Sequence, residues 1–188
     1  MNIEELKVKA ENIVENIKDK GIYLKENTFI DYKLELKLSP NVSNVLIFLR
    51  NFAKDILAFA NKDGGLLLLG FNENKETGEI TDIGLKEDDI NILRAIDLKD
   101  LSDQFVKMFD AQIVVDIHAF NIAARKFYYI LIEKHNSILI PKNDFLDYGL
   151  KKGDIIYRSA GNNLKANERT SEFNTFIEAK VNEKNKEF

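Results

Sequence analysis

The stretch Ala58-Phe-Ala-Asn-Lys-Asp-Gly-Gly-Leu-Leu-Leu-Leu-Gly70 changes its hydrophobic pattern at its glycine pair. Before the pair, the apolar residues of Leu46–Asn61 recur at i, i+3, i+4 and i+7, which predicts a helix packed against a sheet. Gly64 or Gly65 can adopt the left-handed conformation that ends such a helix. Leu66–Leu69 does not alternate with polar residues, which predicts a strand covered on both faces. The stretch therefore predicts a helix, a turn and a buried strand at the centre of an α/β domain.

Upstream of that helix, Phe29–Leu38 alternates between apolar and charged residues after Ile30. The alternation predicts a half-buried strand. Its buried face would carry Tyr32, Leu34, Leu36 and Leu38. Its opposite face would carry Asp31, Lys33, Glu35 and Lys37. With Glu26 shortly before it, this strand brings two carboxylates and a lysine to one region.

The rest of the chain alternates between helical and strand patterns. We expect helices over 2–19, 86–109 with a break near Asp97, and 170–188, and strands over 79–84, 113–120, 126–132 and 154–158. The fold class is therefore α/β (α+β), a single domain with a mixed sheet packed by helices. We divide the chain into an N-terminal helical extension (1–22), the domain (23–169), and a C-terminal helix with a charged tail (170–188).

The amino-acid composition makes some kinds of partner, compartment and metal site less plausible than others. The net charge is −4, with 27 Lys and Arg against 31 Asp and Glu, so polyanion binding through the total field of the protein is disfavoured. The chain has no cysteine, which agrees with a reducing compartment, and we expect a cytoplasmic protein without a membrane partner. With only two histidines, a zinc site is improbable.

The glycines do not form a nucleotide loop. A phosphate loop needs Gly-x-x-x-x-Gly-Lys-Ser/Thr after a strand and before a helix. Here the order is helix, glycine pair, strand, and no Gly-Lys-Ser/Thr follows. We therefore assign the glycines to the turn and find no ATP motif.

Four segments together resemble a known family. These are Glu26…Asp31-Tyr-Lys33, Ala58-Phe-Ala-Asn-Lys-Asp-Gly-Gly65, Leu68-Leu-Gly-Phe-Asn-Glu73 and Ile156-Tyr-Arg-Ser-Ala-Gly161. Their order and spacing over about residues 24–168 are similar to the Schlafen AlbA-like domain family, which is described as nucleic-acid-binding. The glycine-pair segment is the most specific of the four.

The resemblance implies a catalytic site. Eukaryotic relatives include metal-dependent endoribonucleases that cut structured RNA such as transfer RNA, with three acids in their site. Carried onto this chain, the three positions are Glu26, Asp31 and Asn72, and Mg²⁺ or Mn²⁺ would bind at Glu26 and Asp31. Asn72 brings no charge. Glu73 follows it and would point to the other face of a continuing strand, so it could replace the missing acid only if the chain curls there.

The resemblance also implies a nucleic-acid-binding surface, over Asp31–Lys33, the 72–75 loop and 158–163. Its candidate contacts are Lys33, Lys75, Arg158 and Asn162. Lys33 could contact a phosphate or form an ion pair with a neighbouring carboxylate. Arg158 could contact a phosphate beside the Gly-Asn-Asn loop or form a structural salt bridge.

Three functions follow. The first is binding of nucleic acid, with RNA slightly favoured over single-stranded DNA. The second is a metal-dependent endoribonuclease acting on structured RNA. The third is a protein-interaction or regulatory domain without nucleic-acid activity, which the acidic charge allows. The first helix could brace the domain or form a homodimer contact, and the brace is the simpler interpretation.

Overall fold

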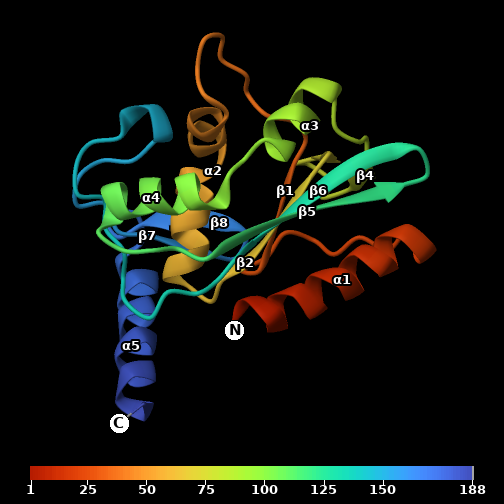
Figure 1. Ribbon diagram of the computed structural model, residues 1–188. Helices are drawn as coiled ribbons and strands as arrows, with labels where there is room; N and C mark the ends of the chain where they lie inside the picture. The colour runs from red at the N-terminus through yellow and green to blue at the C-terminus, as the bar shows by residue number, and fades with distance from the viewer. Residues whose placement is uncertain (188) are drawn as a thin grey trace.

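The computed structural model describes residues 1–187, which form helices around one central sheet and two small hairpins (Figure 1). The helices are α1 (Ile3–Lys20), α2 (Asn44–Asn61), α3 (Glu87–Arg94), α4 (Leu98–Phe109), the 3₁₀ helix η1 (Leu146–Tyr148) and α5 (Thr170–Lys186). The strands are β1 (Ile30–Lys33), β2 (Gly65–Leu69), β3 (Phe71–Glu73), β4 (Ile80–Asp82), β5 (Val115–Ile122), β6 (Arg125–Ile132), β7 (Ile156–Ser159) and β8 (Asn162–Lys165).

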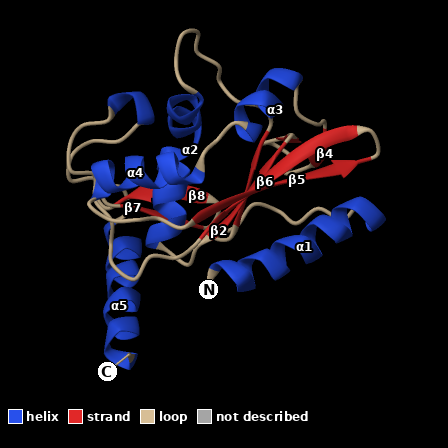
Figure 2. Ribbon diagram, viewed as in Figure 1, coloured by secondary structure: helices blue, strands red, loops and turns tan. Residues whose placement is uncertain are grey.

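The central sheet is mixed, with the strand order β1-β2-β6-β5. β1 and β2 are parallel and α2 connects them, whereas β6 runs antiparallel to both β2 and β5. The hairpins β3–β4 and β7–β8 are separate two-stranded sheets (Figure 2). The predicted fold class, α/β (α+β) with a mixed sheet packed by helices, is confirmed.

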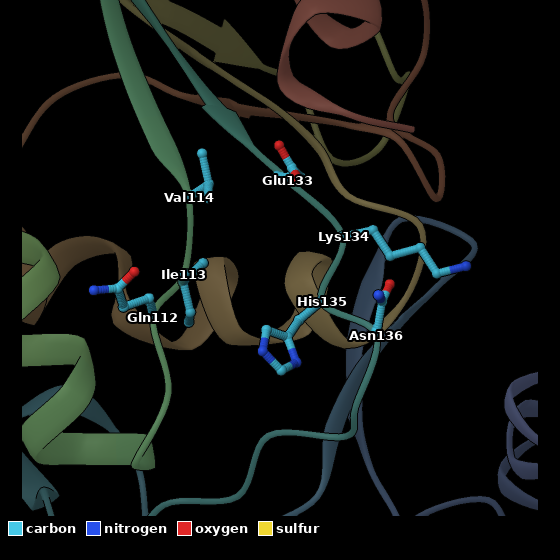
Figure 3. Close-up of a pocket in the computed structure, with 7 residues that line it drawn as sticks. All are labelled: Gln112, Ile113, Val114, Glu133, Lys134, His135 and Asn136. Carbon is cyan, nitrogen blue, oxygen red and sulfur yellow. The ribbon is translucent and has the colours of Figure 1, made fainter. Parts of the chain in front are cut away.

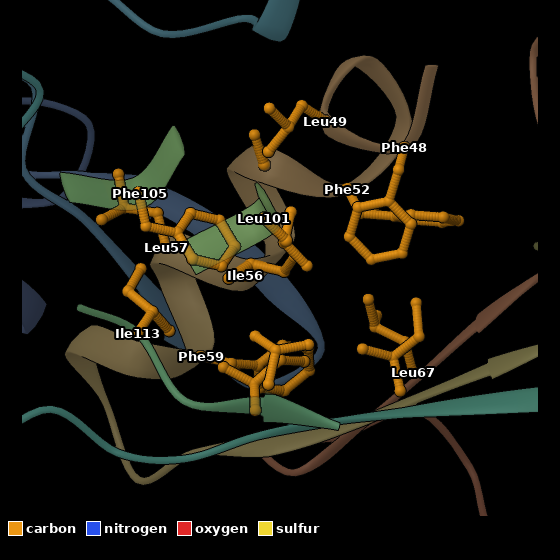
Figure 4. Packing of buried hydrophobic residues seen from close by; sticks show 14 of the residues in the cluster. Phe48, Leu49, Phe52, Ile56, Leu57, Phe59, Leu67, Leu101, Phe105 and Ile113 are labelled. Carbon is orange, nitrogen blue, oxygen red and sulfur yellow. The ribbon is translucent and has the colours of Figure 1, made fainter. Parts of the chain in front are cut away.

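Helices cover both faces of the central sheet. α2 lies on one face with α3 and α4, and α1 runs along the other (Figure 1). In β2, Leu67 and Leu69 join the α2 core, while Leu66 and Leu68 join the α1 core. Figure 4 shows the aromatic rings of α2 packed above Leu67. The strand after the glycine pair is therefore covered on both faces, as its continuous apolar sequence predicts.

The glycines around β2 are needed for backbone geometry. Gly64 has φ +77°, the left-handed conformation that turns the chain after α2. A Cβ at Gly65 would collide with the Phe59 ring and lie 2.8 Å from the carbonyl oxygen of Phe29. Gly70 has φ +100°, and there the chain leaves the central sheet to form β3 in a separate hairpin. Each of these three positions thus has a steric or conformational reason to be glycine.

The prediction of a long strand over 29–38 is wrong beyond Lys33. The backbone leaves the sheet there and is held by side chains instead: Asp89 accepts from the Leu36 N–H at 3.3 Å and Asn51 from the Lys37 N–H at 2.7 Å. Of the apolar residues after Lys33, Leu36 is buried, whereas Leu34 and Leu38 are exposed. The apolar and charged residues thus go on alternating after Lys33, although β2, the strand that pairs with β1, ends opposite Lys33 at Leu69.

The terminal helices pack on the rest of the fold. α1 begins at an Asn2–Glu5 capping box, ends at Gly21, and buries one apolar face against the sheet, as expected of a brace. α5 packs against the β7–β8 hairpin, where the Phe176 ring stacks on Tyr157 at 4.6 Å. The predicted tail ends at Phe188, which lies outside the described residues. The domain boundaries at residues 22 and 169 and a homodimer contact stay predictions. Within residues 1–187, no helix combines the length and apolar character needed to cross a membrane.

Candidate functional site

Three segments that are far apart in sequence meet around Glu26. The ammonium of Lys75, on the β3–β4 turn, lies 3.4 Å from the Glu26 carboxylate. A Cβ at Gly161, on the β7–β8 turn, would lie 3.6 Å from Glu26. Deeper in the protein, Arg158 lies 3.5 Å from Asp31. The surface predicted from 31–33, 72–75 and 158–163 is therefore one continuous region of the molecule.

The centre of this region is a group of three carboxylates, Glu26, Asp31 and Asp55, which we call the carboxylate cluster. Asp31 points from β1 and Asp55 from α2, and both are buried. Lys33 lies between them: its Nζ is 2.9 Å from Asp31 Oδ2 and 3.3 Å from Asp55 Oδ2. Asp31 is thus buried although it lies opposite the face predicted to be buried, because α2 and the β7–β8 hairpin cover its side of β1.

Asp55 was missed by sequence reasoning, although a signal was present. It lies three residues after Phe52 and four before Phe59, so it interrupts the buried face of an amphipathic helix. A carboxylate on such a face is almost always paired. Its partners here are Lys33 and Asn163, whose Nδ2 donates to Asp55 Oδ1 at 2.6 Å.

Arg158 forms the structural salt bridge that the sequence left as one of two alternatives. Its side chain is 2% exposed. Its Nε donates to the Asn27 carbonyl and its Nη2 to the Ile30 carbonyl, both at 3.2 Å, and its Nη1 donates to Asn163 Oδ1 at 3.1 Å. The guanidinium also lies 4.8 Å above the Phe59 ring. A direct contact with a phosphate would require Arg158 to leave all of these partners.

The β7–β8 hairpin contributes Asn163 rather than the predicted Asn162. Residues 162–165 form β8, which the sequence assigned to a loop, and side chains in a strand alternate between its faces. Asn162 is exposed at the turn, while Asn163 connects Arg158 to Asp55. A contact of Asn162 with nucleic acid stays a prediction.

At the third predicted acid position, the structure brings Glu73 rather than Asn72 toward the cluster. Asn72 is exposed and lies opposite Thr81 in the β3–β4 hairpin. Glu73 forms an ion pair with Lys75, whose ammonium also contacts Glu26. The curl expected at Asn72 is absent, because 71–73 is one continuous strand; the chain turns at Gly70 instead, before β3 begins.

The protonation of the cluster is uneven. Burial, with a hydrogen bond between its carboxyl group and Asp31, raises the pKa of Glu26 to about 7. Burial alone would raise the pKa of Asp31 as well, but the hydrogen bond from Glu26 and the charge of Lys33 outweigh it and lower that pKa. Below about pH 7, a proton on this pair therefore resides on Glu26 in preference to Asp31, and Asp31 carries the negative charge.

Asp31 and Asp55 keep the side chain of Lys33 protonated. Burial by itself would lower the pKa of Lys33, but the neighbouring Asp55 and Asp31 raise it, so the ammonium stays charged. Burial raises the pKa of Asp55, with Lys33 and Asn163 acting in the opposite direction. A charged lysine is therefore part of the cluster, and of the two roles considered for it, the ion pair is present.

The arrangement of donors does not fit the Mg²⁺ or Mn²⁺ site that the resemblance implied. Glu26 and Asp31 hydrogen-bond to each other, and Asp31 is already bound by two cationic side chains. Across residues 1–187, no three His, Asp or Glu side chains are grouped so that they could hold a metal ion. A divalent ion needs several oxygen ligands that are free to turn toward it.

A pocket lies where β5 begins and β6 ends, at the open end of their hairpin (Figure 3). It offers no chemistry like that of the carboxylate cluster. Its lining comes from 112–114 and 133–136, and contains no residue of the carboxylate cluster. Lys134 is paired with Glu183 at 2.7 Å, and the His135 ring is hydrogen-bonded to Ser137. His118, on β5, contacts Asp116 at 2.7 Å. Both histidines are thus held by local contacts.

Comparisons with known proteins identify the family. A crystal structure of a Corynebacterium diphtheriae protein is 17% identical, with a TM-score of 0.48, covering 86% of this chain and 30% of that protein. The solution structure of the N-terminal domain of an ATP-dependent DNA helicase RecG-related protein from Nitrosomonas europaea is 18% identical, with a TM-score of 0.43, covering 81% of this chain and 89% of that domain. This chain therefore spans less than a third of the Corynebacterium protein. No curated protein matches it. The family model described as Schlafen, AlbA_2 matches residues 26–167, so the chain belongs to the Schlafen AlbA_2 family.

Proposed function

We propose that this protein binds nucleic acid on the surface around the carboxylate cluster, with RNA favoured over single-stranded DNA. One observation carries the proposal: the three segments that the family resemblance assigns to nucleic-acid contact meet at Glu26. Membership of the Schlafen AlbA_2 family over most of the chain supports a role connected with nucleic acid.

The phosphate contacts would come from lysines at the edge of the cluster. The Lys75 side chain, on the β3–β4 turn, is 76% exposed. Lys25, in the segment before β1, lies beside Gly78 of that turn. Lys33 is a third candidate, since its side chain is 32% exposed. Because the protein as a whole is acidic, a few local contacts would carry the affinity, and each would release counterions.

The test is fluorescence anisotropy with labelled transfer RNA and with a single-stranded DNA of similar length. We expect salt-sensitive binding that Lys75→Ala weakens, with a salt slope shallower by about 0.7 for each lost contact. Lys107→Ala is a matched control, because Lys107 is an exposed lysine on α4, outside the three segments. Absence of binding to either probe at about 50 mM salt would leave the protein-interaction or regulatory function as the better explanation.

Cleavage of RNA is a second candidate function, favoured by the pKa of about 7 of Glu26. A carboxyl group that titrates near neutral pH can accept a proton from an attacking hydroxyl group and return it during the reaction. Incubation of structured RNA with the protein, in EDTA and in Mn²⁺, tests for fragments. Fragments that wild type produces and Glu26→Gln does not would support cleavage. If wild type produces them in Mn²⁺ but not in EDTA, the cleavage depends on a metal ion. Binding without fragments in either condition rejects this candidate and retains the first.

A further inference from the structure

A small pocket lies beside the carboxylate cluster, between α5 and β7. Its volume is about 220 Å³, and its lining comes from Thr28 before β1, Lys62 after α2, 157–159 of β7 and the first turns of α5. Arg158 belongs to both places, since it lines the pocket and lies 3.5 Å from Asp31. Drug-sized ligands occupy pockets of about 300–1,000 Å³, so this one suits a smaller group, on the scale of a single sugar.

Glu172 is the hydrogen-bond acceptor of the pocket. Its Oε1 accepts from Arg169 Nη1 at 2.9 Å and its Oε2 accepts from Ser159 Oγ at 2.7 Å, so the carboxylate is held in one orientation. The hydrogen bonds from Arg169 and Ser159 also lower the pKa of Glu172, so the group is ionised near neutral pH. An ionised carboxylate only accepts hydrogen bonds, and each of its oxygens can accept a second one. Since the side chain is 37% exposed, a ligand that donates a hydrogen bond can reach it.

Tyr157 presents a donor that is not used within the protein. Its side chain is buried, with the ring stacked on Phe176 at 4.6 Å, and among residues 1–187 its hydroxyl finds no hydrogen-bond partner. Burial raises the pKa of this hydroxyl, and the nearby charge of Glu172 raises it further, so the proton stays in place. Buried polar groups are nearly always paired, and an exception calls for an explanation. A ligand hydroxyl group fits here, because it can donate to Glu172 and accept from Tyr157.

Lys62 gives the same pocket a positive charge. Its ammonium lies 5.8 Å from the centre of the Phe176 ring, where the end of α2 meets α5. A lysine binds phosphate as a point charge. One contact for an anion and one for a hydroxyl group, in a pocket of this size, match the ribose-phosphate unit of RNA. The sugar of DNA lacks the 2′-hydroxyl, so it would bring no donor to Glu172 at that position.

We propose that this pocket binds one ribose-phosphate unit of RNA, with Glu172 accepting a hydrogen bond from the 2′-hydroxyl and Lys62 contacting the adjoining phosphate. This role of Glu172 rests on the proposed binding of nucleic acid, and it names the residue that favours RNA over single-stranded DNA. The 2′-hydroxyl is the group by which a protein tells RNA from DNA at a given site.

The experiment measures fluorescence anisotropy of the full chain with one labelled stem–loop in three forms, RNA, 2′-O-methyl RNA and DNA, with the same bases throughout. The 2′-O-methyl form keeps the A-type helix and the oxygen but cannot donate a hydrogen bond. Wild type should bind RNA roughly 10–100 times more tightly than either other form, the value of a hydrogen bond to a charged group.

Three variants separate the sugar contact from the phosphate contact. Glu172→Ala should bind the three forms with nearly equal affinity, and it should fold, because its ion pair with Arg169 lies on the surface. Glu178→Ala is the matched control, since it removes the same charge from an exposed position of α5 outside the pocket, and it should keep the preference for RNA. Lys62→Ala should weaken all three forms alike, because a phosphate contact carries no information about the sugar.

The outcomes distinguish this role from the binding of nucleic acid itself. If wild type binds the three forms equally, or if Glu172→Ala keeps the wild-type preference, the ribose contact is wrong while nucleic-acid binding stands. The same loss of preference in Glu178→Ala would also contradict it, because the charge and not the pocket would then be responsible. If no form binds at about 50 mM salt, the proposed function fails, and the ribose contact fails with it.

Discussion

Replacement of Arg158 by alanine should destabilise the protein strongly. The guanidinium is 2% exposed and donates to the backbone carbonyls of Asn27 and Ile30 at 3.2 Å. It also neutralises part of the charge of Asp31. Arg158 therefore fixes the segment before β1 to β7, across more than half of the chain.

The size of the effect follows from these contacts. A hydrogen bond from a charged donor contributes about 1.5–3 kcal/mol, so the two bonds to the carbonyls account for about 3–6 kcal/mol, and the lower part of this range applies because the Ile30 carbonyl keeps the Asn27 N–H at 3.2 Å. The loss of the ion pair adds less than its usual cost, because Asp31 keeps Lys33 at 2.9 Å. We expect a decrease of about 4 kcal/mol in the free energy of unfolding, or a midpoint lower by roughly 8–16 °C.

Urea denaturation of wild type and Arg158→Ala measures this change, provided that the m-values agree. Arg169→Ala is the control, because Arg169 also pairs with a carboxylate, Glu172 at 2.9 Å, but on the surface. The control should leave stability unchanged within error. A loss below about 1 kcal/mol for Arg158→Ala would refute the reasoning, since the carbonyls would then have found other donors.

Three further predictions concern pH and packing. The stabilisation from Glu26 should be complete below pH 4.5, its unfolded pKa, and be lost as the pH rises through about 7, because only the folded protein holds the proton in that interval. Urea denaturation at several pH values should show this slope in wild type, and an equal slope in Glu26→Gln would contradict it. Burial lowers the pKa of Lys180 from 10.5 to about 8, so stability should increase as the pH rises between these values. Lys180→Met should remove that increase, again measured by urea denaturation. Gly65→Ala should cost about 1–3 kcal/mol by thermal unfolding, because its Cβ would collide with Phe59, and a wild-type midpoint would show that the turn can shift.

The central elements of the fold could be predicted because their patterns are local. The helix before the glycine pair, the buried strand after it and the β5–β6 hairpin each have an apolar period that matches their structure. The break near Asp97 was also local, since Asp97 caps α4 through its own side chain. The same reasoning failed after Lys33, where the end of the strand depends on the length of β2, and at β8, whose partner is β7.

The candidate site could be predicted only in part, since its contacts join residues far apart in the chain. Glu26, Asp31 and Lys33 stand out because they are close together in sequence. Asp55 and Asn163 gain their importance from each other, through a hydrogen bond across 108 positions, and no local pattern reports such a contact. The burial of Arg158 has the same origin, because its acceptors lie near the other end of the chain.

The distance in sequence between Arg158 and Asp31 has a consequence for synthesis on the ribosome. Chains emerge from the N-terminus at about 5–20 residues per second, and domains fold as units. α2 and β1 are complete long before β7 and β8, so Asp31 and Asp55 are exposed to each other while Arg158 and Asn163 are still absent. Until β7 and β8 are translated, Lys33 is therefore the one cationic partner that these two acids have within the cluster. We therefore expect the carboxylate cluster to be completed only when β7 and β8 dock on β1 and α2.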